Sequence, residues 1–364
     1  MSGARLRQGV RDISRLPWPG VAVVAGIVFA LPLVLPAFGL SVATEIFIMA
    51  IFAMSLGLII GYAGLASLGQ AAFFGAGAYV VALLGGSLTN TYALLMAAIL
   101  VGGILALASG ALFVRTSGAY FLMLTLAFGQ VLYAVAFEAD SVTGGADGMS
   151  VSAALNFGFG EVFGEYGLYY VMAVFFLICY LILRVFVSSP AGKAVQGIME
   201  NESRMQALGY NTRTYKLIAY SISGGLAGLA GALYSYFNFY VTPDLFGWVF
   251  SGQALIMVIV GGVGSLLGSA LGAGFFIMAQ EYLSSYTDYW QLVLGVIFVT
   301  FVLVGRGGIF DLLTLIFNRA SSLLPGRDKS ESLRDRRDSR VPNDGEASET
   351  LESDAQEKRR EKSL

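Results

Sequence analysis

Long runs of apolar residues constrain the fold of this 364-residue chain more than any other feature. A helix that crosses the hydrocarbon core of a bilayer needs about 20 consecutive, mainly apolar residues. The chain is 56% hydrophobic and only 13% charged, and a water-soluble domain could not bury that much apolar surface. We therefore expect an all-α integral membrane protein, a polytopic helical bundle of about ten transmembrane segments. The expected segments are Val21–Phe38, Val42–Ile60, Ser67–Gly85, Tyr92–Val114, Ala119–Phe137, Leu168–Val187, Leu217–Phe239, Trp248–Val263, Leu266–Leu283 and Tyr289–Val304.

The distribution of basic residues predicts the orientation of these segments. Before the C-terminal tail, every Lys and Arg falls on one side of the ten-segment arrangement, and the loops on the other side are acidic. By the positive-inside rule, the basic side faces the cytoplasm. We therefore expect a multi-pass protein of the cell membrane, surrounded by lipid, with its N- and C-termini in the cytoplasm. The basic residues are Arg5, Arg7, Arg11, Arg15, Arg115, Arg184, Lys193, Arg204, Arg213, Lys216, Arg306 and Arg319.

Three regions follow from this pattern. A basic cytoplasmic N-terminus, residues 1–20, precedes a transmembrane domain over residues 21–313. Within this domain, residues 188–216 form a polar cytoplasmic segment, and residues 138–167 form a glycine-rich extracytoplasmic loop. Residues 321–364 carry mixed charges and few large apolar side chains, so we expect a disordered cytoplasmic tail. Because both signs of charge are mixed there, the tail does not indicate nucleic-acid binding.

Glycine recurs at helical spacing inside the expected segments, for example at Gly224, Gly228 and Gly231. Small residues let helix backbones approach closely in lipid, where no hydrophobic effect drives helix association. Two further clusters, Gly61–Gly77 and Gly261–Gly274, predict helices that are broken by glycine. Irregular backbone at membrane depth is tolerated only against protein or water, so such breaks often mark a translocation pathway.

The chain lacks the residues that most catalysts and ion-coupled carriers need. It has no histidine, its one cysteine, Cys179, lies in an apolar segment, and Gly192-Lys193 is followed by Ala194 rather than by the Ser or Thr of a phosphate-binding loop. Ion-coupled carriers usually place carboxylates or histidines inside the membrane, and here only Glu45 is a candidate. We therefore expect no enzymatic activity and no cofactor in this chain, and a source of energy outside the membrane. The polar residues at depth are neutral: Ser67, Gln70, Thr125, Gln130, Ser221, Ser223, Asn238 and Gln253.

The polar segment Ser188–Lys216 has a helical pattern of its own. Ser189 can cap a helix and Pro190 suits its first turn. Gly209 suits its end, because glycine tolerates the left-handed conformation. We expect two short amphipathic helices, or one broken helix, at the cytoplasmic surface. The alternative is an interfacial helix that lies on lipid.

Several blocks of the sequence, in order, resemble the LivM-type permeases of branched-chain amino acid ABC importers, a family that also includes urea and amide permeases. The segment GKAVQGIMENESRMQALGYNTRTYK and the helix after it carry the clearest resemblance. The other blocks are Gly61–Leu84, Thr116–Gln130, Asp140–Met149, Leu255–Gly274 and Val302–Leu313. The resemblance implies a permease subunit that pairs with a second, homologous permease, two ABC ATPase subunits that bind ATP-Mg, and an extracytoplasmic solute-binding protein.

The resemblance also implies two groups of functional residues. The ATPase-coupling residues would be Gly192, Glu200, Asn201, Glu202, Ala207, Leu208 and Gly209. The translocation pathway would include or neighbour Ser67, Gln70, Phe73, Phe74 and Gln130.

Three alternatives remain open on the sequence. The permease could belong to a urea or short-chain amide ABC importer, which shares much of the pattern. The chain could act alone as an ion-coupled secondary carrier or channel, in which case uptake would need no nucleotide. It could also be a membrane scaffold or receptor that transports nothing.

Overall fold

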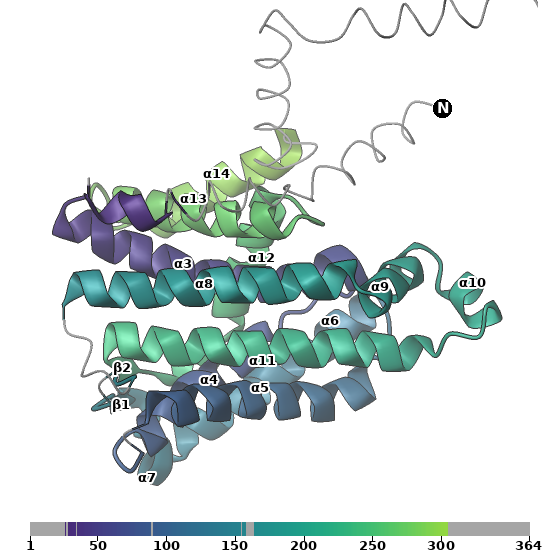
Figure 1. Cartoon of the computed structure of the whole chain (residues 1–364), viewed down its shortest axis with the longest axis horizontal. Helices are drawn as coiled ribbons and strands as arrows, with labels where there is room; N and C mark the ends of the chain where they lie inside the picture. The colour runs from purple at the N-terminus through teal and green to yellow at the C-terminus, as the bar shows by residue number, and fades with distance from the viewer. Residues whose placement is uncertain are drawn as a thin grey trace, which may run out of the picture. The chain divides into compact units, whose positions relative to one another are not determined.

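The computed structural model describes residues 26, 28–33, 35–88, 90–153, 155–157 and 164–304. These residues are mostly helical (Figure 1). The α-helices are α3 (Ala37–Leu58), α4 (Gln70–Leu84), α5 (Thr91–Phe113), α6 (Ala119–Glu138), α7 (Asp140–Thr143), α8 (Glu165–Ser188), α9 (Pro190–Glu200), α10 (Glu202–Ala207), α11 (Thr212–Asn238), α12 (Trp248–Gly261), α13 (Leu266–Ser284) and α14 (Trp290–Val304). Shorter elements are η1 (Leu31–Leu33), the π-helix η2 (Ile59–Ala63), η3 (Gly145–Asp147), η4 (Pro243–Phe246) and the strands β1 (Met149–Ser150) and β2 (Tyr240–Val241), which pair antiparallel.

The lengths of these helices agree with a protein that crosses a membrane several times. Within the described residues, six helices are long and apolar enough to span a bilayer: α3 extended by η2, α5, α6, α8, α11 and α13. Three shorter apolar helices, α4, α12 and α14, coincide with further expected segments. The class of the fold is therefore confirmed, whereas the number of ten segments stays a prediction. The expected regions 1–20 and 321–364, and much of the first segment, lie outside the described residues.

Helix α11 lies at the centre of the bundle, against α3, α4 and α5. Its side chains Tyr220, Ser223, Leu233 and Tyr236 are almost completely buried. The packing is closest where glycines face one another. A Cβ added to Gly77 of α4 would overlap with the backbone carbonyl of Gly228 in α11. The predicted role of the glycines in close helix packing is thus confirmed at this contact.

The two glycine-rich clusters contain irregular turns that contact each other, one after η2 and one after α12, whereas helices broken by glycine stay a prediction. The chain leaves η2 through Gly64, whose φ is 68°, and leaves α12 through Gly262 and Gly264, whose φ values are 111° and 96°. These positive φ values favour glycine because other residues would be strained there. A Cβ added to Gly61 would lie 2.6 Å from the backbone nitrogen of Gly264, so the backbone of η2 is in direct contact with the turn after α12.

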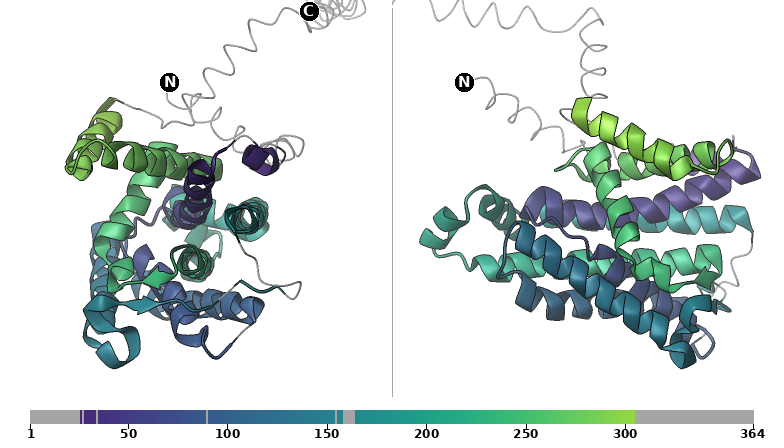
Figure 2. Two further views of the ribbon diagram at one scale, coloured as in Figure 1. Left: turned by 90° about the vertical axis from the view of Figure 1, so that its left-hand side faces the viewer. Right: turned by 180° about the vertical axis from the view of Figure 1, so that it is seen from behind.

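The described bundle has two distinct ends (Figure 1). One end carries α9 and α10, which connect α8 to α11. The other end carries α7 and the ribbon of β1 and β2. Helix α12 runs steeply across the long helices between these two ends (Figure 2). The polar segment of the sequence is therefore a structured cap on one end of the bundle.

Two neighbouring glycines of α5 test the importance of backbone contact. A Cβ at Gly102 would lie 2.5 Å from the carbonyl oxygen of Gly224, whereas a Cβ at Gly103 would have no atom nearer than 3.7 Å. We expect Gly102→Ala to destabilise the protein by about 1–3 kcal/mol, because two backbones must move apart. Gly103→Ala should be neutral or slightly stabilising, since alanine favours helix. The unfolding temperatures of both variants in detergent measure the difference, and equal values would contradict this account.

Candidate functional site

Helix α9 is fixed to the end of α8 by the local chemistry of the turn. The Ser189 hydroxyl accepts a hydrogen bond from the Gly192 backbone N–H at 3.2 Å, and Pro190 occupies the first turn. A side chain at Gly192 would overlap with the carbonyl oxygen of Phe186, so only glycine fits this corner. The Gln196 amide donates to the Val187 carbonyl at 3.1 Å. The predicted helix start at Ser189 and Pro190 is confirmed, and α9 leaves α8 in one defined direction.

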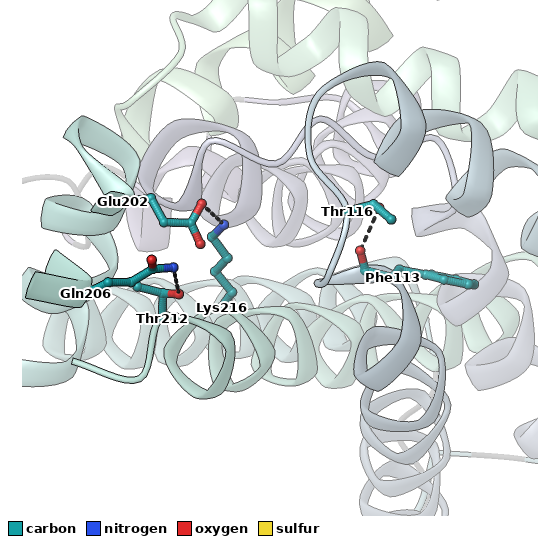
Figure 3. A network of polar contacts seen from close by, with 6 residues as sticks. All are labelled: Phe113, Thr116, Glu202, Gln206, Thr212 and Lys216. Carbon is teal, nitrogen blue, oxygen red and sulfur yellow. Dashed lines mark hydrogen bonds and ion pairs between the residues drawn. The ribbon is translucent and has the colours of Figure 1, made fainter. Parts of the chain in front are cut away.

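Helix α10 is fixed to α11 by polar contacts (Figure 3). Asn201 caps α10, because its side-chain oxygen accepts from the Arg204 backbone N–H at 2.9 Å. The Lys216 ammonium binds the Glu202 carboxylate at 2.7 Å, and the Gln206 amide donates to the Thr212 hydroxyl at 3.2 Å. The Lys216 side chain is only 6% exposed, so Glu202 supplies the anion that this buried cation needs.

The environment of Glu202 lowers its pKa. Partial burial alone would raise the pKa of this carboxyl group above its ordinary value of 4.5. The hydrogen bond and positive charge of Lys216 outweigh that effect, with help from Thr212 and Arg213. Glu202 therefore stays ionised at neutral pH and keeps α10 attached to α11.

Helix α9 also contacts the turn that follows η2. Met199 lies against Gly64, where an added Cβ would be 3.0 Å from the Met199 Cγ. Gly64 ends η2, and Gly61 of the same π-helix contacts Gly264 in the turn after α12. Helix α9 thus contacts the irregular backbone after η2, which lies next to the turn after α12.

The predicted coupling residues divide into two kinds. Glu200, Asn201, Ala207, Leu208 and Gly209 are exposed on the surface of this end. Leu208 is 67% exposed although its side chain is large and apolar. Gly192 is buried in the corner between α8 and α9, and Glu202 is partly buried against Lys216. The last two residues therefore build the segment, whereas the first five form the surface that it presents.

Most of the predicted pathway residues lie inside the packed bundle. Ser67, Gln70, Phe73 and Phe74 are at most 1% exposed. The Gln70 side-chain nitrogen donates to the Ser55 hydroxyl at 2.9 Å and to the Ser223 hydroxyl at 2.8 Å, so it joins α3, α4 and α11. Within the described part of the chain, the side-chain oxygen of Gln70 has no hydrogen-bond partner.

The N-terminus of α4 is buried next to this cluster, and hydroxyl groups accept from three backbone N–H groups at and just before it. The Thr125 hydroxyl of α6 accepts from the Leu68 N–H at 3.2 Å. The Ser67 hydroxyl accepts from the Gly69 N–H at 3.2 Å, and the Ser251 hydroxyl of α12 accepts from the Ala71 N–H at 2.9 Å. Hydroxyl groups from three different segments of the protein therefore hold the start of α4.

Gln130 lies elsewhere, in a cleft of about 450 Å³ between α6 and α12. We call this the α6–α12 cleft. The side-chain nitrogen of Gln130 is buried and has no hydrogen-bond partner among the described residues. The cleft is lined by Gln130, Tyr133, Asp244, Gly247, Trp248, Val249, Phe250 and Gln253.

The sequence indicates some residues of the α6–α12 cleft and of the segment formed by α9 and α10, but gives no signal for others. Gln130 and Gln253 stand out in the sequence as polar residues in apolar segments, and both line the cleft. Asp244 and Trp248 gave no such signal, because one reads as a loop carboxylate and the other as an interfacial aromatic residue. Lys216 reads only as a positive charge on the cytoplasmic side, although it is buried against Glu202.

The ion pair between Glu202 and Lys216 predicts how α10 responds to pH. Because the pKa of Glu202 is lowered in the folded protein, its stabilisation is complete above pH 4.5 and is lost as the pH falls through the folded-state value. Hydrogen exchange of the α10 amides, corrected for intrinsic rates, should therefore accelerate in acid. In Glu202→Gln the exchange should be fast at neutral pH and depend little on pH. An unchanged acid response in this variant would assign the effect to another group.

Comparison with known proteins agrees with this architecture. The model of the family "Branched-chain amino acid transport system / permease component" matches residues 39–302. The high-affinity branched-chain amino acid transport system permease protein LivM of Escherichia coli K12 is 28% identical over 282 residues, which are 70% of this chain and 65% of that protein. The probable LivM protein of Methanocaldococcus jannaschii is 25% identical over 243 residues, 64% of this chain and 68% of that protein.

A second kind of permease is also similar over a shorter range. The LivH permease protein of E. coli K12 is 27% identical over 132 residues, 35% of this chain and 42% of that protein. No solved structure matches the chain. The chain spans about two thirds of the length of the LivM relatives, and just under two thirds of the E. coli protein. Since the family model covers more than half of the sequence, the chain belongs to the family of permease components of branched-chain amino acid transport systems.

Proposed function

We propose that this protein is the transmembrane permease subunit of an ATP-driven ABC importer for branched-chain amino acids. The family supports the role of a permease, and the names of the LivM relatives support the solute. The similarity to LivH supports a second, homologous permease as its partner in the membrane. Two ABC ATPase subunits and an extracytoplasmic solute-binding protein complete the proposed importer.

The cap formed by α9 and α10 carries this proposal. A permease without its own nucleotide site needs a rigid element on which an ATPase can act. The cap is rigid because Ser189 and Gly192 fix α9 to α8, while Glu202 and Lys216 fix α10 to α11. It presents an exposed apolar side chain, Leu208, beside polar groups. We propose this surface as the ATPase docking site and its side of the membrane as the cytoplasm.

Leu208 is the sharpest test of docking, because it is exposed and its replacement removes little packing within the permease. Leu208→Glu should weaken association with the ATPase subunits about tenfold or more, as expected when a charge replaces an apolar side chain at an interface. Co-purification and ATP-driven uptake of leucine in vesicles measure the effect. Glu138 is exposed and lies just before α7, the helix at the other end of the bundle (Figure 1), so Glu138→Lys should leave ATPase association unchanged.

The same vesicles separate this proposal from the alternatives. Uptake that follows an ion gradient and needs no nucleotide would show a secondary carrier. ATP-driven uptake of urea or a short amide in place of leucine would show the related importer class. Absence of any uptake with all subunits present would support a receptor or scaffold.

Reversal of the ion pair tests whether Glu202 acts inside the permease or on the ATPase. Glu202→Lys and Lys216→Glu should each release α10 and reduce uptake, since each leaves two like charges together. If Glu202 only holds α10, the double variant should recover most of the activity, because the pair is restored with opposite polarity. A double variant no better than Glu202→Lys would instead indicate that Glu202 contacts the ATPase.

A further inference from the structure

We propose that the α6–α12 cleft binds the transported solute, as a zwitterionic amino acid with an apolar side chain. The inference rests on the proposed function and adds to it the place and the chemical groups of recognition. The cleft provides hydrogen-bond donors, acceptors including a carboxylate, and aromatic and aliphatic walls, all from one chain. These are the three kinds of contact that an α-carboxylate, an α-ammonium group and an apolar side chain require.

The donors come from Gln130 and from the start of α12. Gln130 lines the cleft, and its side-chain nitrogen is buried without a partner among the described residues, so a ligand that accepts a hydrogen bond would satisfy this nitrogen once the amide turns toward the cleft. Gly247, the N-cap of α12, has no side chain that could accept from the first N–H groups of the helix, those of Trp248 and Val249. These groups and the positive end of the helix dipole favour a carboxylate.

The acceptors come from Asp244 and Gln253. Asp244 lies in η4, immediately before α12, and its side chain is exposed within the lining of the cleft. None of the lining residues is Lys or Arg, so no basic side chain of the cleft neutralises this carboxylate. An ammonium group of the solute would pair with it, with the side-chain oxygen of Gln253 as a further acceptor.

The apolar part of the solute would pack on Tyr133, Val249 and Phe250. Phe250 is held in place by other rings, because its centroid lies 5.4 Å from that of Phe52 and 4.9 Å from that of Phe74. Tyr234 of α11 contacts the same ring, with centroids 6.2 Å apart. This wall is therefore preorganised by the core of the bundle and need not form when the solute arrives.

The combination of groups selects against ligands that lack one charge. A carboxylic acid without an amine would meet Asp244 as a like charge. An amine without a carboxylate would leave Gln130 and the start of α12 without an acceptor. A neutral amide such as urea would leave Asp244 without a counter-charge and would fill little of a cleft of about 450 Å³.

A cysteine reporter inside the cleft tests the assignment without the solute-binding protein. In Tyr133→Cys the new thiol lines the cleft, whereas the native Cys179 is buried. The assembled importer in vesicles is treated with a maleimide, and the labelling rate is compared with and without L-leucine. We expect leucine to slow labelling about tenfold at saturation, and isocaproate, isoamylamine and urea to have little effect at the same concentration. Ser285→Cys, an exposed reporter outside the cleft, should be labelled at the same rate under all conditions.

Two substitutions identify the groups that bind. Asp244→Asn and Gln130→Leu, each made in the reporter protein, should weaken protection by leucine about tenfold, the loss expected for one charge-assisted hydrogen bond. Unfolding temperatures should match that of the reporter alone, which separates a lost contact from a damaged fold.

Uptake of leucine by the parental importer is measured in parallel and tests the proposed function by itself. If the parental importer transports leucine but leucine does not protect the reporter thiol in the cleft, the cleft is not the binding site and this inference is wrong. Equal protection by isocaproate or isoamylamine would also overturn it, because recognition would then be apolar only. Protection by leucine in an importer that transports no leucine would contradict the proposed function and support the cleft.

Discussion

Backbone-to-backbone contact along α11 is the constraint on which the rest of the structure depends. In lipid, burial of apolar side chains does not distinguish a neighbouring helix from the surrounding acyl chains, so association relies on close packing and hydrogen bonds. Gly228 contacts α4 at Gly77, and Gly224 contacts α5 at Gly102, at distances that exclude any side chain. These contacts bring α4 close enough for Gln70 to reach both Ser55 and Ser223. The glycines therefore determine where the buried polar groups can meet.

The central helix also connects the two regions to which we assign function. At one end Lys216 binds Glu202 and so holds α10. Further along, Ser223 takes part in the polar cluster with Gln70, and beyond it Tyr234 packs on Phe250, which lines the α6–α12 cleft. A continuous helix of 27 residues spans about 40 Å, and it moves as one body unless its hydrogen bonds break. The cap and the wall of the cleft are thus linked mechanically through α11.

The sequence predicted the class of the fold and the character of the cap well, because both depend on local patterns. Apolar runs indicate helices that cross a membrane, and Ser189, Pro190 and Gly209 mark the boundaries of the short helices by their conformational preferences. The pathway residues were harder to predict. Gln70 has the same polar character as Gln130, yet it lies among hydroxyl groups in the core, whereas Gln130 lies in the cleft. Which side of a helix faces a neighbour depends on contacts between segments far apart in the chain. A single sequence contains no local signal for such contacts.

The two short helices, α4 and α12, show how tertiary contacts decide the chemistry of similar elements. Both start at a glycine that has no side chain to cap the helix, but α4 begins among buried residues whereas α12 begins with the exposed residues Trp248 and Val249. Hydroxyl groups of Ser67, Thr125 and Ser251 accept from backbone N–H groups of the turn before α4 and of its first turn, so the protein itself holds this helix start. One of these hydroxyls belongs to α12, whose own first residues, Trp248 and Val249, line the cleft. A helix start that is already satisfied stabilises the fold, and one that remains open can bind an anion. The same pair of helices therefore divides the two roles, because α12 helps to hold α4 while its own first residues line the cleft in which we place the ligand.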